Sequence, residues 1–117
     1  MNKMFINFTN HPSSSWEDGQ KEAAKVYGNI VDISFPVIPP KSLEKEVEEL
    51  AENYVKDILE KYPKAVLCQG EYTFVYQVVK KLKENGIVVL AACSERKVKE
   101  ENNRKIVEFQ FERFRKY

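Results

Sequence analysis

Four short apolar runs are spread along the first 93 residues of the chain, and each is bounded by polar residues, glycine or proline. Runs of this length and setting are typical of buried strands. The runs cover residues 4–9, 29–35, 65–69 and 87–93. Because few polar residues interrupt them, they favour parallel strands that are covered on both faces.

The segments between these runs have apolar residues at every third or fourth position, which is the spacing of an amphipathic helix. They predict helices over residues 16–28, 42–62 and 73–86, which end at Gly28, Pro63 and Gly86. Ser14 and Glu17 are placed to form a capping box at the first helix. The alternation of strands and helices predicts a three-layer α/β domain.

The carboxyl-terminal part of the chain has a different pattern, in which apolar and polar residues alternate. Val107, Phe109 and Phe111 alternate with Glu108, Gln110 and Glu112. This is the period of a half-exposed strand, and "EENNR" before it is a turn signal. We therefore predict an antiparallel hairpin of residues 95–99 and 105–114 at one edge of the sheet, where its charges discourage aggregation.

The length of 117 residues is that of a single domain, residues 1–117, with a core of its own. The chain has 19 Lys and Arg against 18 Asp and Glu, and a net charge of +1 is not that of a general binder of duplex nucleic acid. Cys68 and Cys93 lie in apolar runs, which indicates reduced thiols. No signal peptide and no stretch of about 20 apolar residues is present, so we expect a cytoplasmic protein without a membrane partner.

The loops after the first, third and fourth strands carry most of the candidate chemistry. With a strand order of 2-1-3-4, the chain reverses direction between strands one and three, and ligands bind at such a switch point outside the carboxyl ends of the strands. We expect the loops "TNHPSSSW", "QGEYT" and "CSER" to meet there. The expected ligand-binding residues are Thr9, Asn10, Ser13, Ser14, Ser15, Gln69, Gly70, Thr73, Ser94 and Glu95, and the candidate catalytic residues are His11, Glu71 and Arg96. Two of the loops open helices, whose amides and dipoles make a phosphate the expected ligand group.

Each candidate residue also has a purely structural explanation. His11 precedes Pro12 and shapes the turn into the first helix, the serines cap that helix, and Glu71 favours the dipole of the third helix. Arg96 then pairs on the surface with Glu95 or Glu71. The chain has neither a GxxxxGK[ST] loop nor a GxGxxG fingerprint, and one histidine with two cysteines in apolar runs gives no metal-ligand spacing. We therefore expect no metal and no cofactor.

Several segments together resemble one known family. These are "NHPSSSW" followed by "EDGQKEAA", then "CQGEYTF", "ACSERKV" and the closing "FQFERFRKY". They are similar to the small stand-alone Rossmann-like proteins associated with CRISPR systems, which are related in fold to cyclic-oligoadenylate sensor domains and include ring nucleases. The resemblance spans nearly the whole chain. It implies a Rossmann-like sheet in a homodimer that binds a cyclic oligoadenylate across its two-fold axis. Cleavage of that ligand without a metal is a second activity that the resemblance suggests.

In such a cleavage the ribose 2′-hydroxyl attacks the adjacent phosphodiester, while the protein aligns the two groups, stabilises charge and protonates the leaving oxygen. In the expected site geometry, His11 supplies the acid, Arg96 stabilises charge, and Glu71 acts as a base or contacts a ribose. The serines at 13–15 and the helix-start amides hold phosphate. None of the three loops has a lysine before Lys97, which departs from mechanisms that use a lysine there.

Three functions from different classes follow. The first is a CRISPR-associated protein of antiviral defense that binds a cyclic oligoadenylate, with ring-nuclease activity as an extension. The second is a non-catalytic nucleotide-sensing or interaction module that uses the same pocket. The third is a small nucleoside or nucleotide hydrolase or transferase with Glu71 as nucleophile or base.

Overall fold

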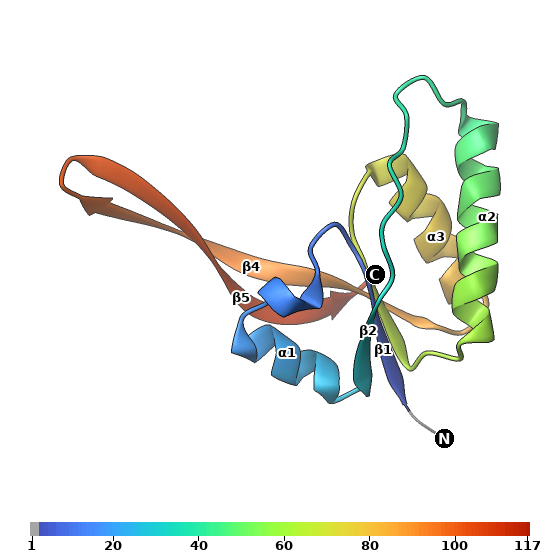
Figure 1. The fold of residues 1–117 in the computed structure, drawn as a ribbon, viewed down its shortest axis with the longest axis horizontal. Helices are drawn as coiled ribbons and strands as arrows, with labels where there is room; N and C mark the ends of the chain where they lie inside the picture. Colours follow the sequence, from blue (N-terminus) through green and yellow to red (C-terminus); the bar gives the residue numbers. More distant parts are fainter. Residues whose placement is uncertain (1–2) are drawn as a thin grey trace.

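The computed structural model describes residues 3–117, which form a five-stranded sheet, three α-helices and a short 3-10 helix (Figure 1). The strands are β1 (Met4–Phe8), β2 (Asn29–Asp32), β3 (Ala65–Cys68), β4 (Val88–Glu101) and β5 (Arg104–Lys116). The helices are α1 (Asp18–Lys25), α2 (Glu44–Glu60) and α3 (Tyr72–Glu84), and the 3-10 helix η1 spans Ser13–Ser15. Within residues 3–117, no helix combines the length and the apolar character needed to cross a membrane.

The strand order across the sheet is β2-β1-β3-β4-β5, which confirms the predicted order of the first four strands. β1 pairs in parallel with β2 on one side and with β3 on the other, and β3 pairs in parallel with β4. Phe8 at the end of β1 is opposite Cys68 at the end of β3. The two strands therefore end level with each other, and the loops that follow them begin side by side.

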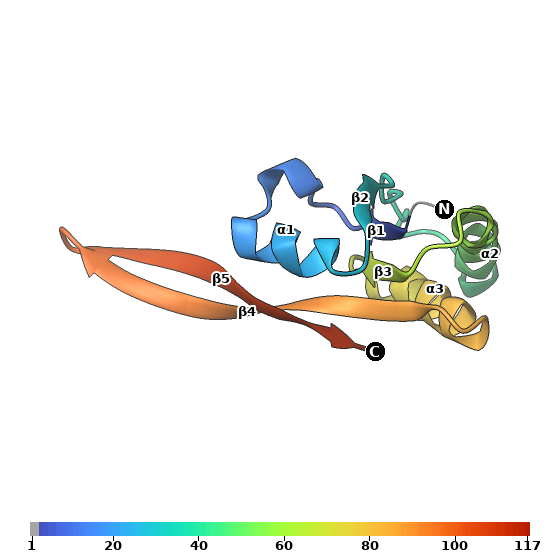
Figure 2. The same cartoon turned by 90° about the horizontal axis from the view of Figure 1, so that it is seen from below.

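Apolar side chains cover both faces of the parallel strands, because successive residues of a strand point to opposite sides. On one face, Ile6, Phe8, Val66 and Cys68 pack against residues of α2 and α3. On the other face, Phe5, Ala65, Leu67 and Leu90 pack against Trp16 and against Ala24 of α1. Figure 2 shows α2 and α3 packed next to each other and α1 beside the β4–β5 hairpin.

The hairpin predicted at the sheet edge is present, but its first strand is a continuation of the fourth parallel strand. β4 runs without interruption because it contains no glycine or proline, and β5 pairs antiparallel along it. Separate strands over residues 87–93 and 95–99 are therefore wrong. The predicted turn is confirmed: Asn102 and Asn103 join the strands with positive φ angles of 52° and 62°, a conformation that asparagine tolerates.

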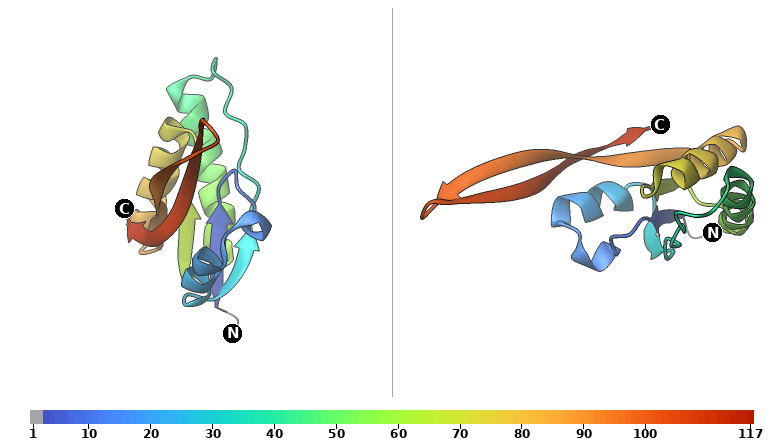
Figure 3. Two further views of the ribbon diagram at one scale, coloured as in Figure 1. Left: turned by 90° about the vertical axis from the view of Figure 1, so that its left-hand side faces the viewer. Right: turned by 90° about the horizontal axis from the view of Figure 1, so that it is seen from above.

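The outer part of the hairpin projects away from the rest of the molecule (Figure 3). We call residues 94–111 the arm, and the remaining residues of the described chain the body. The radius of gyration of 15.8 Å exceeds the roughly 13 Å expected for a compact chain of this length. The projecting arm accounts for the excess.

A β-bulge lies where the arm leaves the body. Arg113 of β5 is opposite Cys93 of β4, whereas Phe111 is opposite Ser94, so Glu112 is an extra residue in β5. The bulge changes which residues of β5 face α1, and it leaves the Phe111 amide available to a side chain of the body.

The entrance to α1 differs from the predicted one. Ser13–Ser15 form η1, which is closed by the Trp16 amide donating to the carbonyl of Ser13. Glu17 then takes the N-cap position of α1, with Asp18 in its first turn. The predicted capping box of Ser14 and Glu17 is therefore wrong. Ser14 lies inside η1, and Glu17 is itself the N-cap residue of α1.

β2 is shorter than predicted and ends at Asp32. The chain after it contains Pro36, Pro39 and Pro40, which lack the amide hydrogen that a strand pairing requires. Ile33, Phe35 and Ile38 of this segment still pack against the core on the α2 and α3 side. The apolar character of "ISF" therefore reports burial, although no strand forms there.

Candidate functional site

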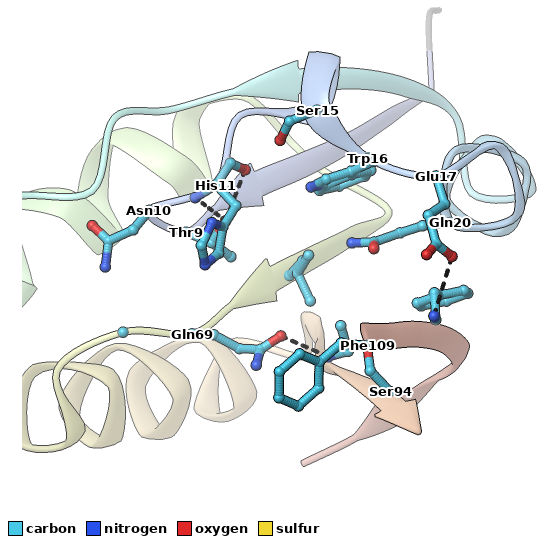
Figure 4. A pocket seen from close by; sticks show the side chains of 14 residues that line it. Thr9, Asn10, His11, Ser15, Trp16, Glu17, Gln20, Gln69, Ser94 and Phe109 are labelled. Atoms are coloured by element: carbon cyan, nitrogen blue, oxygen red, sulfur yellow. Dashed lines mark hydrogen bonds between the residues drawn. The ribbon is translucent and has the colours of Figure 1, made fainter. Parts of the chain in front are cut away.

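A pocket of about 500 Å³ lies at the carboxyl ends of β1 and β3, between α1 and the arm (Figure 4). Small-molecule sites have volumes of roughly 300–1,000 Å³. The lining residues are Thr9, Asn10, His11, Ser15, Trp16, Glu17, Gln20, Leu67, Gln69, Gly70, Ala92, Ser94, Phe109 and Phe111. The structure thus brings together parts of all three predicted loops, through Thr9, Asn10, His11, Ser15, Gln69, Gly70 and Ser94.

The loop after β1 is held by Asn7, a buried polar residue inside that strand. The Asn7 amide nitrogen donates to the His11 carbonyl (2.8 Å) and to the Asp32 carboxylate (3.0 Å), and the Asn7 oxygen accepts from the Thr9 hydroxyl (2.9 Å). Asp32 also accepts from the Ser13 amide (3.2 Å) and hydroxyl (3.0 Å). Because a satisfied polar network specifies one geometry, Asn7 and Asp32 are positioning residues for the His11 segment.

Trp16, Glu17 and Gln20 form the α1 side of the pocket. Trp16 is buried and packs edge-on against Phe5, with 6.2 Å between the ring centroids. The Glu17 carboxylate accepts a hydrogen bond from the Phe111 amide at 3.2 Å, which ties the start of α1 to the bulge. Figure 4 shows the Gln20 side chain pointing into the space between α1 and the arm.

Gln69 and Gly70 form the edge of the pocket at β3. The Gln69 side-chain oxygen accepts from the Ala92 amide at 2.7 Å, which orients the side chain and leaves its NH₂ group as a donor. A side-chain carbon at position 70 would fall within the ring of Phe35. Glycine is therefore required for this loop to pack against the core.

The arm contributes aromatic side chains to the pocket. Phe111 packs against Phe114 at 5.0 Å between ring centroids, and Phe114 packs against Phe5 of the core at 5.3 Å. Phe109 also lines the pocket but is 64% exposed. The pocket thus has a buried aromatic wall and an open aromatic edge.

Glu71 lies outside this pocket, as the N-cap residue of α3. Its carboxylate accepts from the Phe74 amide (2.8 Å) and from the Thr73 hydroxyl. These hydrogen bonds, with that of Thr73 the larger influence, lower the pKa of Glu71 from its ordinary value, which makes it a weak proton acceptor. Glu71 and Thr73 instead line a second cavity of about 670 Å³, beside Pro39, Pro40, Tyr72 and Tyr76.

Arg96 and Glu95 belong to the arm and do not line the pocket. In the ladder Arg96 is opposite Phe109, and Glu95 is opposite Gln110. Directly opposed residues lie on the same face of a sheet, so Arg96 shares the face of Phe109, one pair outward from Ser94. Glu95 lies on the other face. The three candidate catalytic residues are therefore not gathered around one point.

At two of the predicted phosphate seats, a carboxylate of the chain already accepts a hydrogen bond from a backbone amide. Asp32 accepts from the Ser13 amide, and Glu71 accepts from the Phe74 amide. The N-cap of α1 is the acidic residue Glu17. The Glu17 side chain makes no cap hydrogen bond at α1, because its carboxylate accepts from the Phe111 amide instead. That helix-start amides hold a phosphate stays a prediction.

The charge of the pocket is correspondingly low. Glu17 is the carboxylate in its lining, His11 is the group that becomes cationic on protonation, and neither Lys nor Arg is among the lining residues. Ser14 is exposed in η1 and lies outside the lining. Across residues 3–117, no cluster of three or more His, Cys, Asp or Glu side chains is arranged to hold a metal ion.

Several residues of the site were missed from the sequence. Asn7 had a signal, because a single polar residue interrupts the apolar run "MFINF". Glu17 and Gln20 lie on the polar side of a predicted helix, and nothing in their spacing distinguishes them from solvated residues. Phe109 and Phe111 were assigned to a half-exposed strand, and the structure shows that they line the same pocket as the loop after β1.

Comparison with known proteins gives a family assignment. No curated protein and no solved structure matches the chain. A family model described as the uncharacterized protein MJ1673 family matches residues 3–115. Because the match covers nearly the whole chain, the protein belongs to the uncharacterized protein MJ1673 family.

Proposed function

We propose that the protein binds a cyclic oligoadenylate in the pocket between the body and the arm. The observation that carries this proposal is the combination of aromatic rings and side-chain amides at the carboxyl ends of adjacent parallel strands. Ligands of open α/β sheets bind at this end, at the point where the strand order reverses. Here the reversal lies between β1 and β3.

The side chains of the pocket suit a planar base better than a phosphate. Trp16, Phe109 and Phe111 offer ring surfaces for stacking. Glutamine side chains pair with the edge of adenine, and Gln69 presents an oriented NH₂ donor while Gln20 points into the same space. The lining has neither Lys nor Arg. Because Arg96 lies beside the pocket on the same face of the arm as Phe109, the phosphates of the ligand lie toward the arm.

The wider proposal follows the resemblance stated from the sequence. It takes the sheet and its helices as a Rossmann-like layered domain, and the protein as a CRISPR-associated homodimer. A cytoplasmic location is part of it, supported by the two free cysteines Cys68 and Cys93.

Binding is tested by titrating the protein with cyclic tetra-adenylate and cyclic hexa-adenylate. Trp16 is the single tryptophan of the chain and lines the pocket, so its fluorescence reports occupancy. Phe109→Ala is expected to weaken binding about 5- to 150-fold, since stacking of one base contributes roughly 1–3 kcal/mol. Tyr72→Ala removes a similarly exposed ring at the second cavity and should leave the affinity unchanged.

A further variant tests the hydrogen-bond donor of Gln69. Gln69→Glu keeps an oxygen for the Ala92 amide but replaces the NH₂ group with a second oxygen. Affinity should fall while the melting temperature stays near that of the unaltered protein. Absence of binding to either ring, or an equal loss in the Phe109 and Tyr72 variants, would refute the proposed function.

Cleavage of the bound ring is a second candidate function, and the observation that favours it is the placement of His11 in the pocket. The 2′-hydroxyl oxygen would attack phosphorus to form a 2′,3′-cyclic phosphate, with His11 protonating the departing 5′-oxygen and Glu17 accepting the hydroxyl proton. His11→Ala should then slow product formation by roughly 100-fold or more. If the ring binds but chromatography shows no linear product, the cleavage function is refuted and only the binding function remains. The third function, with Glu71 as nucleophile, has no support from the site because Glu71 caps α3.

A further inference from the structure

One face of the arm continues outward from the pocket. Four opposed pairs lie on it in sequence, beginning at the pocket: Ser94 with Phe111, Arg96 with Phe109, Val98 with Val107, and Glu100 with Lys105. Directly opposed residues and every second residue along a strand share a face. We call these eight residues the arm face.

The middle of the arm face is apolar and uncovered. Val98 is 49% exposed, Val107 43% and Phe109 64%. A two-stranded hairpin is marginally stable in water unless its apolar face packs against something. The contact of Glu17 with Phe111 lies at the base of the arm and does not cover this region.

We infer that the arm faces of two copies of this chain pack against each other, about a two-fold axis through the pair Val98–Val107. In this arrangement the two arms run in opposite directions, so the inner end of one face lies over the outer end of the other. Val98 and Val107 meet their counterparts at the axis. The apolar centre is then buried by the apolar centre of the second copy.

The charges on the arm face are complementary to themselves in this arrangement. Arg96 of one copy lies opposite Glu100 of the other, which pairs a guanidinium with a carboxylate. Phe109 of one copy lies opposite Lys105 of the other, which places an ammonium group over an aromatic ring. A parallel arrangement, with the axis along the arm, would instead place β4 over β5 of the other copy, with Arg96 over Phe109 and Glu100 over Lys105. The pairing of Arg96 with Glu100 is therefore specific to the antiparallel arrangement.

The whole arm also carries balanced charge, with cationic residues Arg96, Lys97, Lys99, Arg104 and Lys105 and anionic residues Glu95, Glu100, Glu101 and Glu108. A polynucleotide partner requires a clearly basic surface. A strongly acidic or basic protein partner would likewise favour an excess of one sign. Balanced charge with an apolar centre fits a second copy.

The arrangement supplies the pocket with a group that its own lining lacks. Lys105 of the second copy would reach the rim at Phe109, where the lining has neither Lys nor Arg. A guanidinium has five N–H donors, so Arg96 in contact with Glu100 of the second copy retains donors for a ligand phosphate. This role of Lys105 rests on the proposed nucleotide binding, whereas the association of the arms does not.

The association is tested without ligand, by light scattering coupled to size exclusion over a range of protein concentrations. The unaltered protein should show a mass of twice the 13.7 kDa chain. Val107→Asp should weaken dimerisation about 100-fold or more, because it buries a carboxylate against an apolar surface. Ile106→Asp is the matched control, since Ile106 is the adjacent residue of β5 and lies on the opposite face, paired with Lys99.

A charge reversal keeps the test valid even where Val107→Asp disturbs the hairpin itself. Arg96→Glu and Glu100→Arg should each weaken the dimer, and the double variant should restore it, because the contact is re-formed with reversed signs. A monomer at all concentrations, an equal effect of Val107→Asp and Ile106→Asp, or a double variant weaker than both singles would each overturn the inference.

The contribution of Lys105 to the site is measured separately by ring titration. At a protein concentration at which the variant is dimeric, Lys105→Gln should reduce both the affinity for the ring and its dependence on salt, because one phosphate contact is lost. Unchanged ring affinity in a protein that still dimerises would overturn this part alone. If the arm variants lose the dimer but no form of the protein binds the ring, the proposed interface is correct and the proposed ligand is wrong.

Discussion

The body and the arm of this protein use apolar residues in opposite ways. In the body, β1 and β3 are apolar on both faces, and helices cover each side. In the outer part of the arm, β4 and β5 continue the same sheet without a helix on either face, and Val98, Val107 and Phe109 remain exposed. The pocket lies where the two regions meet. One strand, β4, therefore belongs to a packed interior at one end and to an exposed surface at the other.

The largest expected effect contrasts a core phenylalanine with an arm phenylalanine. Phe74 of α3 is fully buried and packs against Phe8, Phe35 and Tyr54. Phe74→Ala should cost about 3–5 kcal/mol of unfolding free energy, because it leaves a cavity. Phe109→Ala should cost within about 0.5 kcal/mol in the monomer, as for other surface positions. Urea unfolding of both variants checks the contrast.

A large loss for Phe109→Ala at a protein concentration where the chain is monomeric would contradict the comparison. It would mean that the arm packs on the body in solution. The same loss at high concentration only would instead agree with association of two arms.

An intermediate effect is expected at the boundary of the body and the pocket. Gly70→Ala places a carbon in the ring of Phe35, and it should cost about 1–3 kcal/mol, as overpacking does. Gly19→Ala in the first turn of α1 meets no atom within 4 Å. It should stabilise the protein by about 0.4–1 kcal/mol through the unfolded state. Thermal unfolding of the two variants checks this difference. An unchanged melting temperature of Gly70→Ala would contradict it, because it would show that the Phe35 ring can move away from the added carbon at no cost.

The smallest expected effect is the pH dependence that Glu71 gives to the body. Because the hydrogen bonds of Thr73 and Phe74 lower the folded-state pKa of Glu71, its stabilisation is present above the unfolded-state pKa and is lost as the pH falls through the folded-state pKa. The effect should stay below about 1 kcal/mol, because an exposed carboxylate is well screened. Glu71→Gln should flatten this acid-side slope in urea unfolding curves. An unchanged slope would mean that other carboxylates dominate it.

The sequence predicted the parallel sheet well, because its strands are buried on both faces and their apolar runs have no competing explanation. The predicted order of β2, β1, β3 and β4 was adopted as the order of an open doubly wound sheet, and it is confirmed. The extent of β4 was underestimated, since "SERKVKEE" is polar and only its pairing with β5 keeps it in a strand. The pairing of this segment with β5 is a tertiary interaction, and the local amino-acid composition does not predict it.

The site was predicted in part for the same reason. His11, Gln69 and Ser94 converge because strand topology alone brings their loops together. Glu71 was placed wrongly in the pocket, because a carboxylate at a helix start is first bound by the amides of its own helix. Asn7 and Asp32 hold the His11 loop through a hydrogen-bond network between β1 and β2, and a network of that kind is visible only once the register of the two strands is known.

The bulge at Glu112 affects how this chain can change in evolution. If Glu112 were paired in a regular ladder, Phe114 in the core and Phe111 in the pocket would be three strand positions apart and would point to opposite sides of β5. With the bulge, the strand register of the body and that of the arm are set independently of each other. Relatives can therefore lengthen or shorten the arm at the Asn102–Asn103 turn, by equal numbers of residues in each strand, without disturbing either the core or the pocket.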